Sequence, residues 1–341
     1  MKSCRRALLL AAMTFSTACA ALIGTGAAEA ADPVKIRLSY VVPISNWADM
    51  VAQKKDLTRN LGKSYQIEVT RFAGTPPMIT ALAAGELDIA NLAYPTLPIA
   101  IANAGMDDLR VIADEFQDGN AGFYSNEFMV LADGPIKKVE DLKSKVVASN
   151  AAGSAVDIAM RAMLRKHGLE DKRDYTVVEA PFPTMRAMLA EKKVDLVPAV
   201  LPFAYDPELR RIGHTLFDTK DAVGITQFSM WTARKGFIEK NRAALTDMME
   251  DSLRIVRWYL DPANHKEAME ICARITRQPA ERFAWVFTGK DNYRDPNMMP
   301  DLAALQRNVD LTRDLGFIKA SFDVSKFADL SVVQDAAKRL K

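Results

Sequence analysis

The sequence is poor in the residues from which metal sites and covalent catalytic centres are built. Its 341 residues include three cysteines and three histidines, and the histidines stand far apart, in no metal-ligand spacing. Cys4 and Cys19 fall in an N-terminal leader, which leaves Cys272. One thiol forms no internal disulfide and, without a neighbouring histidine, no zinc site or Cys–His pair. We therefore expect no metal site and no disulfide.

Catalytic sequence motifs are missing as well. The chain has no G-x-x-x-x-G-K-[ST] phosphate loop and no G-x-S-x-G nucleophile turn. Its one G-x-G, Gly24 to Gly26, lies in the leader. The sequence thus predicts a protein that is not an enzyme and that carries no cofactor.

The leader itself has the three parts of an export signal. Lys2, Arg5 and Arg6 are basic, residues 7–23 carry no charge, and Ala28-Glu29-Ala30 is a small-x-small cleavage site. The uncharged run is mostly Ala, Thr and Ser, which is too weakly apolar for a membrane anchor. We expect this signal peptide, residues 1–30, to be removed near Ala30 and the mature protein to be periplasmic.

Two details of export stay open. Arg5-Arg6 followed by Ala7-Leu8-Leu9 loosely resembles a twin-arginine signal. Ser16-Thr17-Ala18-Cys19 is a poor lipoprotein box, because a serine stands where an apolar residue is expected. The sequence therefore leaves both the export route and a lipid on Cys19 undecided.

Charge and apolar runs exclude two kinds of partner. Without the leader, which carries three basic residues and one acidic residue, the chain balances 42 basic against 42 acidic residues. A nucleic-acid-binding protein would show a basic excess. Residues 89–106 carry no charge, but Pro95 and Pro98 forbid a regular membrane-spanning helix there. We expect a strand, a loop and a short helix in that stretch.

Strands and helices alternate along the mature chain. Strand patterns cover residues 34–42, 66–72 and 88–93, with helices expected from Ser45 to Gly62 and from Thr75-Pro76 to Gly85. This order predicts a parallel sheet with right-handed crossovers.

The same order restarts further along. Strands are expected at 145–149, 175–179 and 195–200, with helices from Ser154, which pairs with Asp157 as a cap, and from Pro183. A shift of 107 residues aligns 82–95 with 189–202 without a gap. The repeat predicts two α/β lobes of the same type. Residues 224–233 then read as a strand, and 237–260 as a helix whose methionine-rich stripe packs in the core.

Five segments together resemble the periplasmic substrate-binding proteins of ABC importers, in the branch of sulfonate, taurine, nitrate and thiamine-pyrimidine receptors. They are ALAAGELDIA (81–90), IKKVEDLKSKVV (136–147), M-L-x-x-x-G-L (163–169), LQRNVDLTRDLGFI (305–318) and FADLSVV (327–333). One departure is Ser144, where the family usually has glycine.

The resemblance implies a type II periplasmic binding protein fold, with two Rossmann-like α/β lobes joined by two hinge strands and a ligand cleft between them. The crossings would fall near residues 126–131 and 228–232. Lobe one would hold residues 31–127 and 231–341, and lobe two residues 128–230. The partners it implies are a small-molecule ligand and the permease of an ABC transporter in the inner membrane, with the receptor itself a monomer.

Ligands of open α/β sheets bind at the carboxyl ends of the strands, where helix N-termini offer free N–H groups to an anion. The candidate ligand-binding residues on the loops at those ends, hydroxyl, amide, glycine and aromatic residues for the most part, are Ser45, Asn46, Trp47, Gly74, Thr75, Pro76, Tyr94, Thr96, Asn150, Gly153, Ser154, Phe182, Thr184, Phe203 and Tyr205.

Arg186, just inside a predicted helix, is the candidate clamp for a carboxylate or sulfonate, with Arg71 as the alternative. No acidic residue stands in these loops, and their aromatic residues favour an organic ligand. The sequence therefore predicts delivery of a small organic anion. A thiamine-pyrimidine-type receptor, a synthase-like enzyme and an orphan ligand sensor stay open as alternatives, although the cysteine-rich motif of the synthases is absent.

Overall fold

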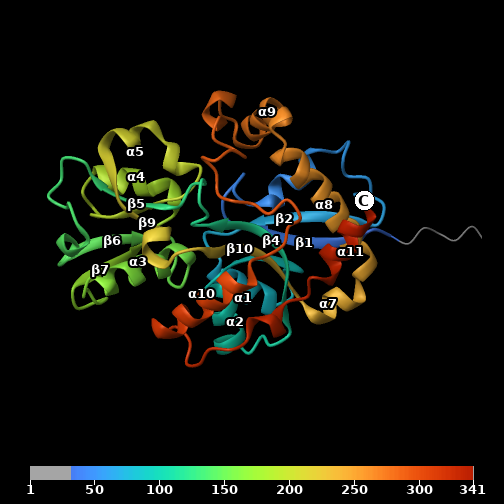
Figure 1. The fold of residues 1–341 in the computed structure, drawn as a ribbon, viewed down its shortest axis with the longest axis horizontal. Helices are drawn as coiled ribbons and strands as arrows, with labels where there is room; N and C mark the ends of the chain where they lie inside the picture. Colours follow the sequence, from blue (N-terminus) through green and yellow to red (C-terminus); the bar gives the residue numbers. More distant parts are fainter. Residues whose placement is uncertain (1–31, 341) are drawn as a thin grey trace, which may run out of the picture. The chain divides into compact units, whose positions relative to one another are not determined.

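Figure 1 shows the computed structural model of the protein, which describes residues 32–340. The predicted signal peptide lies outside the described residues. Among the residues that are described, no helix is long and apolar enough to cross a membrane.

Lobe one is built on a five-stranded sheet with the order β2-β1-β3-β10-β4. Strand β1 is parallel to β2 and β3, which confirms the predicted parallel order. Strand β10, from much later in the chain, is antiparallel to both β3 and β4. The strands are β1 (Val34–Tyr40), β2 (Tyr65–Arg71), β3 (Ile89–Ala93), β4 (Leu109–Asp118) and β10 (Thr226–Arg234).

Both faces of this sheet are covered, so its central strand reads as a continuous apolar run. All five residues of β3 are buried, with Ile89 in one hydrophobic cluster and Ala90 and Leu92 in another. Helices α1 (Pro76–Ala83) and α2 (Thr96–Ala104) pack into the second cluster. The stretch 89–106 is thus a strand, a turn and a short helix, as predicted.

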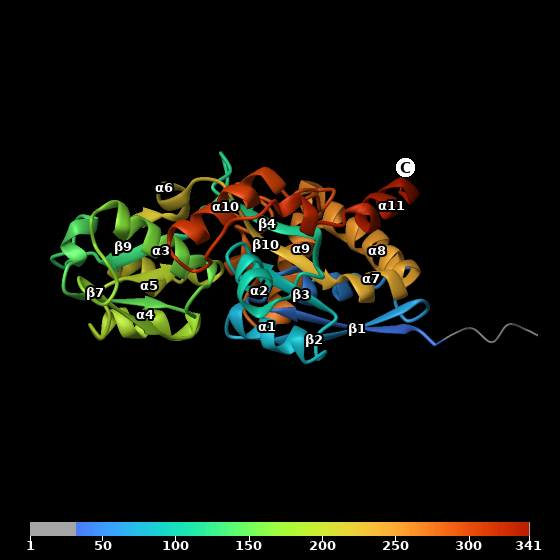
Figure 2. The same cartoon turned by 90° about the horizontal axis from the view of Figure 1, so that it is seen from below.

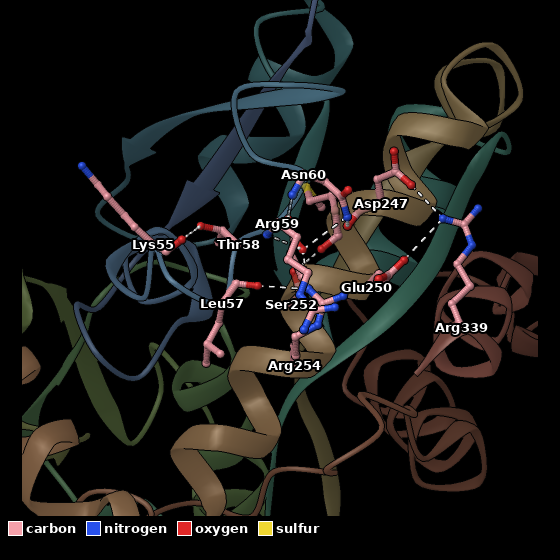
Figure 3. A network of polar contacts seen from close by, with 12 residues as sticks. Lys55, Leu57, Thr58, Arg59, Asn60, Asp247, Glu250, Ser252, Arg254 and Arg339 are labelled. Atoms are coloured by element: carbon pink, nitrogen blue, oxygen red, sulfur yellow. Dashed lines mark hydrogen bonds and ion pairs between the residues drawn. The ribbon is translucent and has the colours of Figure 1, made fainter. Parts of the chain in front are cut away.

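The prediction of a helix between Ser45 and Gly62 is wrong. The segment instead contains two 3-10 turns, η1 (Trp47–Asp49) and η2 (Val51–Gln53), followed by irregular chain. The buried carboxylate of Asp251 accepts hydrogen bonds from the backbone N–H groups of Arg59 and Asn60, at 3.0 and 2.9 Å. Figure 3 shows this turn beside the long helix that carries Asp247 and Glu250. A distant carboxylate thus satisfies N–H groups that a helix would otherwise have bonded.

Lobe two contains a three-stranded sheet, β8-β5-β9, and a two-stranded parallel pair, β6-β7. A parallel bridge between Val147 and Leu196 connects the pair to the segment before β8. The strands are β5 (Glu127–Leu131), β6 (Lys145–Ser149), β7 (Tyr175–Glu179), β8 (Val197–Ala199) and β9 (Gly213–Asp218).

The two helices predicted in lobe two begin at Ala155 and Phe182, next to the predicted Ser154 and Pro183, and two shorter helices were not predicted. Ser154 caps α3, and its hydroxyl accepts a hydrogen bond from the N–H of Asp157 at 3.4 Å. Ser144, which replaces the usual glycine, has a φ of +62°, so it adopts the left-handed conformation that glycine would favour. The helices are α3 (Ala155–Lys166), α4 (Phe182–Ala190), α5 (Pro207–Ile212) and α6 (Thr219–Val223).

The chain passes between the lobes twice. On the way out it leaves β4 at Asp118 and enters β5 at Glu127, and on the way back it runs from α6 into β10 at Thr226. Strand β10 pairs only with strands of lobe one, and β5 only with strands of lobe two. The lobe boundaries stay a prediction, and the pairing favours a second boundary near residue 225 over 230.

Lobe one is completed by the C-terminal helices (Figures 1 and 2). The single helix expected over residues 237–260 is interrupted at Asn241. Its methionine-rich stripe is core, as predicted, because Met248 and Met249 are fully buried. These helices are α7 (Lys235–Lys240), α8 (Arg242–Leu260), α9 (His265–Thr276), α10 (Leu302–Asp314) and α11 (Ser331–Arg339).

The repeat seen in the sequence has a structural counterpart. The Asp88 carboxylate accepts the N–H of Arg37 in β1, and the N–H of Asp88 donates to the carbonyl of Arg37. Asp195, 107 positions later, makes the same two bonds with Val146 in β6. Each aspartate thus fixes the entry to a segment that lies beside β1 in lobe one or β6 in lobe two.

Candidate ligand-binding site

A pocket with about 530 Å³ of empty space, part of it solvent at its mouth, is lined by residues from both lobes. Most of its wall is apolar, and none of its lining side chains carries a charge. The lining residues are Val41, Val42, Ser45, Asn46, Thr75, Asn91, Ala93, Phe116, Asn126, Asn150, Ser154, Ala155, Val156, Phe182, Val200, Leu201, Phe228, Ser229 and Asn292.

The carboxyl ends of strands supply the first part of this wall, as the sequence analysis expected. Ser45 and Asn46 follow β1, and Thr75 follows β2. In lobe two, Asn150 and Ser154 follow β6, and Phe182 follows β7. The structure thus brings six of the sixteen candidate residues together at one cavity.

Four other candidates support these six from behind. The Tyr94 hydroxyl donates to the carbonyl of Ala155 at 3.0 Å, and the Thr96 hydroxyl lies 2.6 Å from that of Thr75. A β-carbon at Gly74 would lie 2.8 Å from the Asn150 side chain, and one at Gly153 would lie 3.1 Å from Ile99. Both glycines therefore leave room for close contacts at the cavity.

Three aromatic candidates pack beside the cavity. Trp47 is buried and stacks on Phe287, with ring centroids 5.7 Å apart. Phe203 stacks on Phe182 at 6.3 Å, and the Tyr205 hydroxyl donates to the carbonyl of Lys290 at 2.9 Å. Trp47, Phe203 and Tyr205 therefore shape the wall without lining the cavity.

The remaining candidates lie elsewhere. Pro76 is the first residue of α1, and the Thr184 hydroxyl donates to the carbonyl of Pro181 on the surface. The Arg186 side chain is 45% exposed and lies 3.6 Å from the Asp206 carboxylate. The structure therefore places the expected anion clamp outside the cavity, where it pairs with a residue of its own lobe.

Sequence reasoning missed the part of the wall that strands and an irregular segment provide. Phe116 in β4, Phe228 and Ser229 in β10, and Asn126 between the lobes line the cavity. Asn292 comes from a segment with neither helix nor strand. The strand residues belong to runs that read as ordinary core, and Asn292 has no periodic pattern around it, so the sequence carried no signal for them.

Buried carboxylates hold several of these polar groups. Glu115 is fully buried and accepts hydrogen bonds from the Asn46 amide and the Ser229 hydroxyl, both at 2.6 Å. It also accepts the N–H of Trp47 at 2.9 Å and the indole N–H of Trp231 at 3.2 Å. Burial raises the pKa of Glu115, and the hydrogen bonds oppose that rise. The four hydrogen bonds that reach its two oxygens favour the carboxylate form of Glu115.

Asp118 acts in the same way at the crossing between the lobes. It accepts the Ser125 hydroxyl, and both the backbone N–H and the side-chain amide of Asn126. Burial raises the pKa of Asp118 to about 6, so this group is ionised at neutral pH.

Arg294 lies behind the wall formed by Ser45 and Phe116. Its guanidinium donates to the carbonyls of Ser45 and Glu115, at 2.9 and 3.2 Å, and lies 4.6 Å from the centroid of the Trp47 ring. The side chain is 3% exposed and does not line the cavity. Its charge therefore positions the loop of Ser45 and balances neighbouring carboxylates.

Hydrogen bonds cross from lobe to lobe at the cavity. The Ser45 hydroxyl donates to the carbonyl of Leu201 at 2.9 Å, and the Asn150 amide donates to the carbonyl of Ala73 at 3.2 Å. The bond from Tyr94 to Ala155 also crosses. The cavity therefore lies where the two lobes touch.

The two α/β lobes, with a cavity formed at the carboxyl ends of their strands, define the fold of the two-lobed periplasmic substrate-binding proteins of ABC importers. The chain belongs to the NMT1-like family, whose family model matches residues 29–273. No curated protein matches the chain by sequence.

Solved structures share this fold at low sequence identity. The alkanesulfonate-binding protein SsuA from Xanthomonas axonopodis pv. citri, bound to MOPS, has a TM-score of 0.69 at 17% identity, covering 88% of this chain and 99% of that one. The periplasmic nitrate-binding protein NrtA from Synechocystis PCC 6803 has 0.69 at 16%, covering 91% and 89%. The desulfurization enzyme DSZB has 0.63 at 14%, covering 90% and 100%. The fold therefore serves both binding proteins and an enzyme.

Proposed function

We propose that this protein is an extracytoplasmic solute-binding protein that captures a small organic molecule between its lobes and delivers it to an ABC transporter. The observation that carries the proposal is the mostly apolar cavity at the contact between the lobes. Clefts at the carboxyl ends of strands, walled by apolar side chains with a few polar groups, are typical ligand sites. Closure of the lobes would present the loaded state to the permease.

The wall of the cavity favours binding over catalysis. Its polar residues are serines, one threonine and asparagines, and none has a base within its hydrogen-bond network that could activate it as a nucleophile, apart from Ser229 on Glu115. Burial raises the pKa of Cys272, which lies in a hydrophobic core cluster and does not line the cavity. A thiolate nucleophile is therefore not available at this site.

Of three features expected to bind an organic anion, one is present at the cavity and two are not. The N–H groups of Ala155 and Val156 start α3 at the cavity, which suits an anion. Helix α1 instead begins with Pro76 and Pro77, which have no N–H to donate. Arg186 lies outside the cavity. Organic acids therefore belong in any ligand screen, without being the class that the cavity favours.

A thermal-shift screen of the mature protein tests the proposal. A ligand that binds the folded state alone stabilises it by RT ln(1 + [L]/Kd), about 2.7 kcal/mol at a hundredfold excess over Kd. We expect at least one class of small organic compounds to raise the melting temperature. Saturable stabilisation by none of a broad panel of acids, amides, alcohols and amines would argue against a receptor.

Export and assembly follow from the same proposal. We propose that the chain is secreted, cleaved near Ala30, and works as a periplasmic monomer beside its permease. N-terminal sequencing of protein recovered from the periplasm, together with its mass, tests this. A retained leader or an acylated Cys19 would change the site of action from the free periplasm to the membrane surface.

A further inference from the structure

Three of the four hydroxyl groups that line the cavity donate their protons to protein partners. Ser45 donates to the Leu201 carbonyl at 2.9 Å, Ser229 to Glu115 at 2.6 Å, and Ser154 to the Asn150 carbonyl oxygen at 2.7 Å. A serine hydroxyl has one proton and two lone pairs. What these three residues can still offer a ligand is therefore an acceptor.

Two buried asparagines at the cavity have their amide orientation fixed by their neighbours. Asn126 donates to the Asp118 carboxylate at 2.6 Å, and Asn292 donates to the carbonyl of Tyr124 at 3.2 Å. Because a carboxylate and a carbonyl only accept, the NH₂ group of each amide must face them. The carbonyl oxygens then lie on the opposite side of each amide.

These two oxygens have no hydrogen-bond partner within residues 32–340, although Asn126 is 2% exposed and Asn292 is 3% exposed. Neither oxygen is sealed inside the protein, so each is open to a partner in the cavity. Both residues line the cavity. A hydrogen-bond donor on the ligand would satisfy them.

The electrostatics of the wall point in the same direction. The carboxyl groups of Glu115 and Asp118 lie directly behind Ser229 and Asn126, and the hydrogen bonds that each accepts favour its ionised form. Arg294 donates through Nη1 to two backbone carbonyls, and its Nε and Nη2, buried without a hydrogen-bond partner among the described residues, do not line the cavity. An anion at these oxygens would meet acceptors with negative charge behind them, and a cation would be buried without a carboxylate in contact with it.

We propose that the cavity selects an uncharged organic ligand that donates hydrogen bonds, through hydroxyl, amino or amide N–H groups, to Asn126 and Asn292. The aromatic rings of Phe116, Phe182 and Phe228 enclose the apolar body of that ligand. This inference rests on the proposed receptor function and narrows its ligand class from organic anions to neutral donors.

Matched compounds that share a body and differ in one group test the proposal on the unaltered mature protein. The probes are benzamide, benzoate and benzylamine, together with the same triad on cyclohexane and on pyridine, each titrated by calorimetry. We expect the best amide to bind at least about tenfold more tightly than its carboxylate and its amine. Tighter binding of the carboxylates or the amines, or no binding of any amide, would overturn the ligand class.

Variants assign the selectivity to the two asparagines. Asn292→Leu and Asn126→Leu each remove an acceptor and should weaken amide binding about tenfold or more, with carboxylate binding unchanged. Asn297→Leu, on the same segment but exposed, is the matched control and should bind as the unaltered protein does. Equal loss for amide and carboxylate would indicate only a structural role and would count against the assignment.

The two proposals fail differently. Carboxylate binding that closes the lobes would overturn the neutral-donor class and leave the receptor function intact. Binding without closure, seen by scattering with the tightest probe, would overturn the receptor function itself.

Discussion

The loop after β1 in lobe one and the loop after β6 in lobe two have the same geometry, built from different residues. In lobe two Gly153 has a φ of +74°, and its N–H donates to Asp157 at 2.9 Å. In lobe one Ile44 has a φ of +72°, and its N–H faces the carboxylate of Asp49 at 3.3 Å. In both lobes the next residue is a serine that lines the cavity.

The two loops differ in how the conformation is held. Glycine adopts a positive φ without strain, whereas a β-branched residue there is an outlier. Ile44 is fully buried in the hydrophobic core, and this packing offsets the strain. The cavity serine is thus positioned by the backbone freedom of glycine in lobe two and by the burial of Ile44 in the core in lobe one.

The two loops also differ in whether an arginine pairs with their aspartate. Asp157 is fully buried and paired with Arg161, at 2.9 and 3.0 Å, whereas no arginine contacts Asp49 within the described chain. The two aspartates at the strand entries differ in the same way: Asp88 in lobe one is paired with Arg37 at 2.7 Å, and Asp195 in lobe two bonds only to the backbone. Of these four aspartates, the loop aspartate is the arginine-paired one in lobe two, and the strand-entry aspartate is the arginine-paired one in lobe one.

The largest effect is expected when the paired loop is made to resemble the unpaired one. Arg161→Met leaves the Asp157 carboxylate buried without a cation, which should cost about 3 kcal/mol of the free energy of unfolding. Burial already raises the pKa of Asp157, and Arg161 opposes that rise. The loss of Arg161 should raise the pKa of Asp157 further. The folded variant then keeps a proton at pH values where the unfolded chain has released it. The deficit in the free energy of unfolding should therefore grow as the pH rises from 5 to 8.

Urea unfolding of both proteins at several pH values measures this deficit. Arg161→Met combined with Asp157→Asn is the control, because a neutral amide needs no cation and should remove most of the pH dependence. A deficit that is the same at pH 5 and pH 8 would show that Arg161 acts through packing alone.

A smaller effect sharpens the comparison of the two backbones. Ile44→Ala and Ile44→Gly both remove a buried side chain, which costs about 2–5 kcal/mol. At an ordinary position alanine is the more stable of the two residues, but at a φ of +72° glycine should be more stable by about 1 kcal/mol. Unfolding midpoints of the two variants measure the difference. A more stable alanine variant would show that this loop relaxes out of the left-handed conformation.

Sequence patterns predicted most of the fold because the fold depends on local signals. The strands around the two lobes, the proline that opens α1 and the Ser154–Asp157 cap all follow from residues close to one another in the chain. The segment 45–62 was predicted wrongly because its conformation depends on Asp251, almost 200 residues away. No local pattern records a contact of that separation.

The site was predicted in part for the same reason. Loops after strands are identifiable from turn residues, so Ser45, Thr75 and Ser154 were found. Phe228 lies in a strand that reads as ordinary core, and Asn292 lies in an irregular segment far along the chain, so no local pattern places either residue at the cavity. The position of Arg186 on α4 was predicted correctly, but the direction of its side chain depends on Asp206, which begins another helix.

The central claim is that ligand closes one lobe on the other, and the distance between the lobes tests it most directly. Cys272 is fully buried, so spin labels can be attached selectively through Glu86→Cys in lobe one and Lys192→Cys in lobe two, both on exposed turns. Double electron–electron resonance then gives the distribution of distances between the labels, for the free protein and for the protein with the tightest ligand of the screen. We predict a population that shifts to shorter distance and narrows when ligand binds. The same distribution with and without saturating ligand would contradict the claim.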